Sequence, residues 1–173
     1  IMALSKFILV DLSWSMSQVG MLTGVGHLLV MLVGGFVASN FVKRRGYRAT
    51  LLTGLKMVLF GGCLWIAIAE NWLAGVWSVW GTSIIVGLGM GFVAVSTYTY
   101  SMRFSQQTTQ PATNIAFFQG TQTFGEIVFS SIATSVAGVA SYSIALGLGA
   151  VIAVFCLLAL LKLECFRHWS NAY

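Results

Sequence analysis

The chain has 173 residues, of which 58% are hydrophobic and 8% are charged, and its formal net charge is +5. Soluble domains carry about a quarter charged residues, so this composition excludes a soluble globular domain and indicates an integral membrane protein. The three cysteines show no CxxC pairing, so neither a zinc site nor a disulfide framework is indicated.

The apolar residues occur in blocks of about twenty, the length that an α-helix needs to cross roughly 30 Å of hydrocarbon. They lack the strict alternation of barrel strands, so the predicted fold class is an all-α membrane protein, a helical bundle. Residues 1–10 are too short to cross, and we expect them to be the end of a helix that begins upstream. A single transmembrane domain, residues 1–173, is predicted, with complete spans at about 20–41, 50–69, 72–100, 114–139 and 144–163 and a tail at 164–173.

The basic residues predict the orientation of these spans. If the spans alternate in direction, every Lys and Arg except Lys6 falls at or near the face that carries the loop VKRRGYR, residues 42–48. The positive-inside rule then places this loop and the C-terminus in the cytoplasm. The net positive charge is explained by this topology and by contact with anionic lipids, so no nucleic-acid partner is expected.

A loop motif follows the first full span, in GGFVASNFVKRRGYRATLL, residues 34–52. Arg44, Gly46 and Arg48 match the cytoplasmic loop motif of the major facilitator superfamily, which this stretch resembles. Three positions depart from that motif, where Ser39, Lys43 and Tyr47 replace a glycine, an acidic residue and a basic residue. Glycine lets the chain reverse, and basic side chains hold the loop at the cytoplasmic surface. Such a degenerate copy is typical of the second half of these transporters.

Two further stretches resemble one branch of that superfamily, the siderophore-uptake permeases of the rhizobactin and pyochelin type and the muropeptide permeases. They are FILVDLSWSMSQVGMLTGVG, residues 7–26, and MRFSQQTTQPATNIAFFQGTQTFGEI, residues 102–127. The resemblance implies the C-terminal half of a 12-helix transporter in a bacterial cytoplasmic membrane, with helices seven, as a stump, to twelve. It also implies a missing N-terminal half as partner, a small-molecule substrate and two halves that rock about a central site.

A polar stripe crosses the fourth complete span. Its members are spaced by three or four residues and therefore share one helix face, and they are Gln119, Gln122, Glu126, Ser130 and Thr134. A carboxylate in this position is costly unless it is solvated, paired or protonated. We therefore expect Glu126 to face a water-filled cavity as a proton carrier or substrate contact. The alternative is a structural glutamate that is hydrogen-bonded to neighbouring helices.

Two other ionisable residues are candidates for the same pathway. His27 lies at a depth similar to that of Glu126, so a pair that couples protons to substrate is one hypothesis, and a packing histidine is the other. Asp11 lies at the outer mouth, where it is either a solvated turn residue or a contact for gating or substrate.

Aromatic residues have two interpretations as well. Tyr98 and Tyr100 end the third complete span, and the family resemblance implies that this helix lines the cavity, where they would contact substrate. The alternative is an interfacial aromatic belt. We assign Trp14 to such a belt, whereas Trp77 and Trp80 lie deeper and belong to the core or to a cavity.

Several other functions find no support in the sequence. The glycine patterns do not follow strands, so no cofactor is expected, and Gly20 with Gly24 and Gly87 with Gly91 are instead predicted to let helices approach closely. An enzyme is not expected, because HExxH, GxSxG and paired acids are missing, and no metal site is expected. The remaining alternative to a proton-coupled transporter is a non-transporting scaffold subunit of the membrane.

Overall fold

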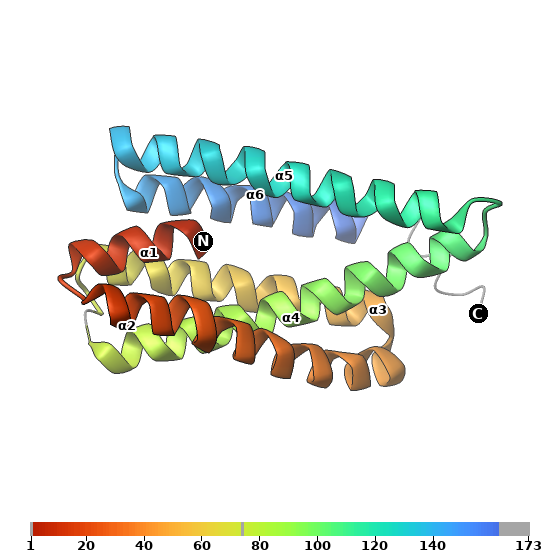
Figure 1. Cartoon of the computed structure of the whole chain (residues 1–173), viewed down its shortest axis with the longest axis horizontal. Coiled ribbons are helices and arrows are strands. Elements are labelled where there is room, and N and C mark those ends of the chain that lie inside the picture. Colours follow the sequence, from red (N-terminus) through yellow and green to blue (C-terminus); the bar gives the residue numbers. More distant parts are fainter. Residues whose placement is uncertain (1, 74, 163–173) are drawn as a thin grey trace.

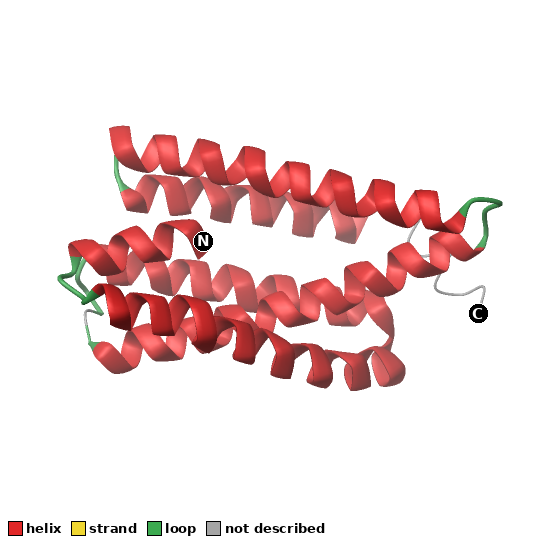
Figure 2. Cartoon of the chain, in the orientation of Figure 1, coloured by secondary structure: helices red, strands yellow, loops and turns green. Residues whose placement is uncertain are grey.

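The computed structural model describes residues 2–73 and 75–162, and within them every regular element is helical (Figure 2). The elements are α1 (Met2–Asp11), α2 (Met16–Gly20), the π-helix η1 (Met21–Gly26), α3 (His27–Ala69), α4 (Val76–Gln106), α5 (Pro111–Val139) and α6 (Tyr142–Lys162). The predicted all-α class is therefore confirmed. The predicted tail, residues 164–173, and the predicted last residue of the fifth span lie outside the described residues.

Two of the predicted spans are joined in α3. The helix has 43 residues and one non-helical position, Gly46, with φ 81° and ψ 162°. The chain reverses there, so that a first arm, residues 27–45, and a second arm, residues 47–69, run antiparallel (Figure 1). Positive φ with ψ near 160° is open to glycine almost alone, which is why the reversal occurs at this residue. The expected loop at 42–48 is thus wrong in extent, because helix continues up to the glycine on both sides.

The remaining spans are found with shifted ends. Three stretches are long and apolar enough to cross a membrane, namely Met16–Ala69, Val76–Gln106 and Tyr142–Ala159, and the first of them contains both arms. α4 extends to Gln106 instead of residue 100, since helical backbone continues past the apolar block that hydropathy detects. α5 is not among the three because of its polar residues, although its 29 residues would cover about 40 Å.

Glycines allow α4 to lie against both arms of α3. A Cβ added at Gly91 would lie 2.6 Å from the carbonyl oxygen of Met31 in the first arm. On the second arm, a Cβ added at Gly54 would lie 2.9 Å from the carbonyl oxygen of Gly89. The predicted close approach at Gly87 and Gly91 is confirmed. That at Gly20 and Gly24 is wrong, since a Cβ added at either would meet nothing within 4 Å.

α5 and α6 form a hairpin that lies as a second layer beside the other helices (Figure 1). α6 packs on α3, and α5 touches α4 and α1. The main apolar cluster joins this hairpin to α1, η1, α4 and the second arm, and its fully buried members include Leu4, Leu9, Leu22 and Ile68. α5 itself has no buried residue, so most of its surface is left without a protein partner in the described chain.

The turns lie at two opposite ends of the bundle (Figure 1). The acidic end contains the turns at 12–15, 70–73 and 140–141, with Asp11 beside the first and Glu70 in the second. The basic end contains the Gly46 reversal and the turn at 107–110, with Lys43, Arg44, Arg45, Arg48 and Arg103 nearby. This separation of charge agrees with the alternation on which the predicted orientation depends. The assignment of the basic end to the cytoplasm stays a prediction.

Candidate functional site

Glu126 lines a pocket between α5, α6, the start of α1 and the middle of α4, which we call the Glu126 pocket. Its empty volume is about 1040 Å³, part of which is open to the outside. Leu4 and Met90 contribute from α1 and α4, and Glu126 and Ser130 are the polar side chains of an otherwise apolar lining. The pocket therefore places one carboxyl group at the junction of the α5–α6 hairpin with the other helices.

The carboxyl group of Glu126 has a partner on its own helix. The amide Nε2 of Gln122 donates a hydrogen bond of 3.0 Å to Oε1 of Glu126. Residues four apart share a helix face, so the predicted stripe geometry brings these two side chains together. The structural alternative requires a hydrogen bond from Glu126 to a neighbouring helix. Among the described residues there is no such bond.

The other members of the stripe lie on the surface of α5. Gln119, Ser130 and Thr134 are all exposed. The hydroxyl of Ser130 donates to the carbonyl oxygen of Ile127 at 3.0 Å, and that of Thr134 donates to the carbonyl oxygen of Ser130 at 2.8 Å. These hydroxyls thus satisfy their donors within α5, and the stripe presents its remaining acceptors to whatever covers this face.

His27 lies in a different pocket from Glu126. The His27 pocket is lined by Ser5, Leu22, Thr23, His27, Trp65, Ser83 and Val86 and has an empty volume of about 300 Å³. No residue lines both pockets, and Nε2 of His27 is buried without a hydrogen-bond partner. The hypothesis of a His27–Glu126 pair is therefore wrong for this conformation. The physical reason is that α1 separates them, since its adjacent residues Leu4 and Ser5 line one pocket each.

Asp11 is exposed but hydrogen-bonded, in contrast to a solvated turn residue. The hydroxyl of Tyr142 donates to Oδ2 of Asp11 at 2.6 Å. Beside it, the hydroxyl of Ser143 donates to Oε1 of Glu70. The first two residues of α6 thus bind one acid from α1 and one from the turn after the second arm. Sequence reasoning missed these partners.

Tyr98 and Tyr100 point to different neighbours. Tyr98 lines an exposed groove with Phe36 and Ser39 of the first arm. The ring of Tyr100 lies 5.9 Å from that of Tyr47, centroid to centroid. The two tyrosines therefore do not form one site, and neither lines the Glu126 pocket.

The loop motif has a structural role at the basic end. Gly46 supplies the left-handed backbone of the reversal. Next to it, the guanidinium of Arg45 lies 5.2 Å from the ring centroid of Phe41, and that of Arg103 lies 5.8 Å from the ring centroid of Tyr47. The cation–π contact of Arg103 with Tyr47 links the reversal to the end of α4. Arg44 is exposed and Arg48 is half-buried.

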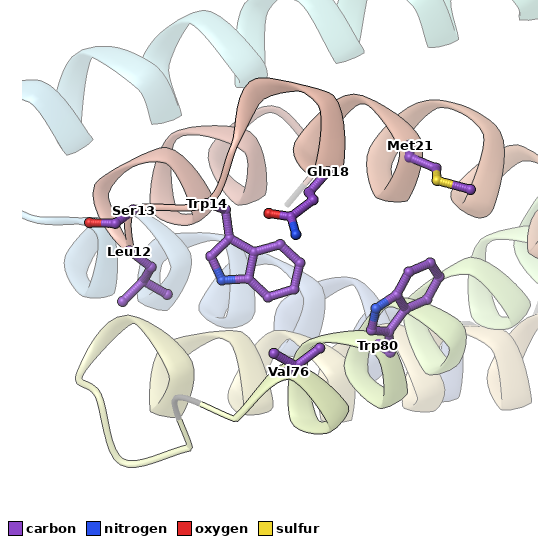
Figure 3. Close-up of a pocket in the computed structure, with 7 residues that line it drawn as sticks. All are labelled: Leu12, Ser13, Trp14, Gln18, Met21, Val76 and Trp80. Carbon is purple, nitrogen blue, oxygen red and sulfur yellow. The ribbon is translucent and has the colours of Figure 1, made fainter.

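A third pocket lies at the acidic end and was missed by sequence reasoning (Figure 3). Trp14, Gln18 and Trp80 are among its lining residues, and its empty volume is about 780 Å³. In Figure 3 the Gln18 amide lies beside the indole ring of Trp14, and Trp80 stands farther along the pocket. Oε1 of that amide accepts a hydrogen bond from the backbone N–H of Ser15 at 3.2 Å, within the capping box of α2. Trp14 and Trp80 therefore both line this pocket.

No group of three or more His, Cys, Asp or Glu side chains in the described residues is placed to hold a metal ion. The chain matches the family model described as Major Facilitator Superfamily over residues 1–171. Comparisons with curated proteins and with solved structures gave no significant match.

Proposed function

Because the chain belongs to the major facilitator superfamily, a family of membrane transporters, we propose that it is the C-terminal half of a proton-coupled secondary transporter. In this proposal it moves a polar, siderophore-like solute across a bacterial cytoplasmic membrane by alternating access, together with an N-terminal half. Glu126 carries the proton. The observation that supports this role most directly is the position of Glu126 in an apolar pocket with its hydrogen-bond partner on its own helix.

The chemistry of the pocket favours a carboxyl group that changes its protonation state. A charged side chain in the bilayer centre costs about 2.5–3.5 kcal/mol on insertion scales. Ionised Glu126 is therefore favoured while water reaches the pocket, where the Gln122 amide donates to one of its oxygens. When the halves close and water leaves, the neutral acid is favoured. Proton binding is thereby coupled to closure of the pocket.

The nature of the solute rests on the loop resemblance alone. The stretches at residues 7–26 and 102–127 favour a siderophore, with a muropeptide or another small molecule as the alternative. A siderophore is bulky and polar, so the path must be wide and must offer hydrogen-bonding groups. The open stripe of amides and hydroxyls on α5 offers such groups.

The experiment compares two transport modes of the full-length protein in reconstituted vesicles. Glu126→Gln is expected to abolish uphill uptake driven by a proton gradient and to retain exchange of labelled for unlabelled siderophore. Exchange requires no net proton movement, so it separates a proton carrier from a group needed for binding. Glu126→Asp keeps an acid and is expected to retain part of the driven uptake.

The matched control is Glu70→Gln, which changes the acid at the acidic end that accepts from Ser143. It is expected to leave the ratio of driven uptake to exchange unchanged. Driven uptake by Glu126→Gln at the wild-type level would show that Glu126 does not carry the proton. Loss of both modes in Glu126→Gln would assign the residue to solute binding instead.

A further inference from the structure

The His27 pocket contains a polar atom whose bonding is incomplete. Nε2 of His27 is buried and has no hydrogen-bond partner among the described residues. A buried nitrogen in this state is costly, and it normally indicates a water, an ion or a functional role. The proposed transport cycle does not use His27, so this nitrogen needs a separate explanation.

The local helix geometry directs His27 into this pocket. The segment Met21–Gly26 is a π-helix, and the N–H of His27 donates to the carbonyl oxygens of Leu22 and Gly24. A bond between residues five apart places Leu22 and His27 on one face, and both line the pocket. In an α-helix residues three and four apart share a face, so the π-helix is what brings these two together. Single π-helical turns of this kind are frequent at functional sites.

Additional polar groups line the same pocket as the imidazole. Thr23 donates its hydroxyl to the carbonyl oxygen of Val19 at 2.7 Å, which leaves the oxygen able to accept. Ser83 is 9% exposed and lines the pocket from α4. A buried water needs two to four polar partners and room for about one small sphere. Nε2, the Thr23 oxygen and the Ser83 hydroxyl supply three polar groups, and the space open to a water centre is about 10 Å³, which is enough for one molecule. The pocket lining includes no Asp, Glu, Lys or Arg.

We propose that the His27 pocket is a second proton site of this half, in which one water molecule bridges the imidazole of His27 to the hydroxyls of Thr23 and Ser83. Through this water the Nε2 lone pair takes up a proton from hydronium, and the water stays bound. The site is separate from the Glu126 pocket because α1 lies between them. It therefore does not depend on the proposed role of Glu126.

The first test is nitrogen NMR of histidine-labelled full-length protein in lipid bilayers, with His27→Asn used to identify the His27 signals. Magnetisation transfer from water to the imidazole is expected in the wild type. Ser83→Val fills the pocket with apolar volume. Ser83→Ala only removes one hydrogen-bond partner of the water, so it tests the same point if the larger variant does not fold. Both are expected to lower the transfer at least several-fold.

Ser96→Ala is the matched control. Ser96 is a buried serine on the same helix, and its hydroxyl donates to the carbonyl oxygen of Phe92 at 2.7 Å. This variant is expected to keep the wild-type transfer. The proposal is overturned if water does not reach the wild-type imidazole, or if Ser83→Ala and Ser96→Ala give the same signal.

The second test measures solute uptake by the full-length protein against pH. A histidine changes charge between about pH 5 and 8, so His27→Asn is expected to flatten the uptake profile in that window. Ser96→Ala is expected to follow the wild type. A profile of His27→Asn that superimposes on the wild type would contradict the proton site even with bound water. Failure of the Glu126 role would instead appear as unchanged driven uptake in Glu126→Gln.

Discussion

α4 and α5 are helices of nearly the same length, 31 and 29 residues, with opposite environments. α4 lies between the two arms of α3 and has eleven buried residues, whereas α5 has none. The difference lies in what their small residues meet. Glycines of α4 touch backbone of both arms, but an added Cβ at Gly120, Gly125 or Gly138 of α5 would meet nothing within 4 Å.

α3 and α4 form a tightly packed part of the molecule, whereas the surface of α5 is mostly exposed. Tight backbone contacts make α3 and α4 one rigid unit, because neither helix can shift without opening a void. α5 carries the polar stripe on an exposed surface, part of which lines the Glu126 pocket. A helix of that kind suits a face that meets water, lipid or another half of a transporter.

The largest effect is expected when the same methyl group is added to each helix, because this tests directly whether α4 is packed and α5 is exposed. In Gly91→Ala the new Cβ would lie 2.6 Å from the Met31 carbonyl oxygen and 2.7 Å from the Gly35 nitrogen, both of which are backbone atoms. The two helices must separate, so we expect a loss of at least about 3 kcal/mol, at the upper end of overpacking effects. Thermal unfolding of the purified full-length protein and its monodisperse yield measure this loss.

Gly120→Ala is the matched change on α5. It adds a methyl group to open space and replaces a poor helix former, so we expect a gain of up to about 1 kcal/mol. Opposite signs for the two variants would support the distinction between the helices. Equal unfolding temperatures for Gly91→Ala and Gly120→Ala would show that α4 is not packed as described.

A smaller effect is expected where the α5–α6 hairpin joins the other helices. Tyr142→Phe removes the hydrogen bond to Asp11 and leaves the ring in place. We expect a loss of about 0.5–1.5 kcal/mol, the net value of one hydrogen bond. A double-mutant cycle with Asp11→Asn checks that the two side chains act together, since a shared bond makes their effects non-additive.

Tyr98→Phe provides the control for this cycle, because Tyr98 is an exposed tyrosine of the rigid unit. Its effect is expected to add to that of Asp11→Asn within about 0.5 kcal/mol. Additive effects of Tyr142→Phe and Asp11→Asn would mean that the bond contributes nothing to the attachment of α6.

The sequence predicted those features that depend on local pattern. Helical spacing placed the stripe from Gln119 to Thr134 on one face, and all its members are exposed. A glycine in the basic loop predicted the reversal, and Gly46 has the positive φ that only glycine adopts easily. Each of these follows from a few neighbouring residues.

Features that depend on the arrangement of helices were not predictable in the same way. The predicted pair rested on the depth of His27 along its helix, and depth does not say which side of α1 a residue faces. The π-helical turn before His27 also rotates the side chain relative to an α-helix, and hydropathy does not reveal such a turn. The bond between Asp11 and Tyr142 joins residues 131 positions apart, so no local pattern could indicate it.

The smallest expected effect on stability is at the stripe itself. Gln122→Ala removes the 3.0 Å hydrogen bond to Glu126 on an exposed face, and pairs of this kind stabilise a helix by about 0.2–0.5 kcal/mol. Alanine is also the better helix former, which offsets part of that loss. We therefore expect an unfolding temperature close to that of the wild type, with Thr121→Ala on the same helix as control. A loss of more than about 1 kcal/mol would exceed the value of such a pair. It would mean that the stripe is packed against protein, and the contrast between α4 and α5 would no longer hold.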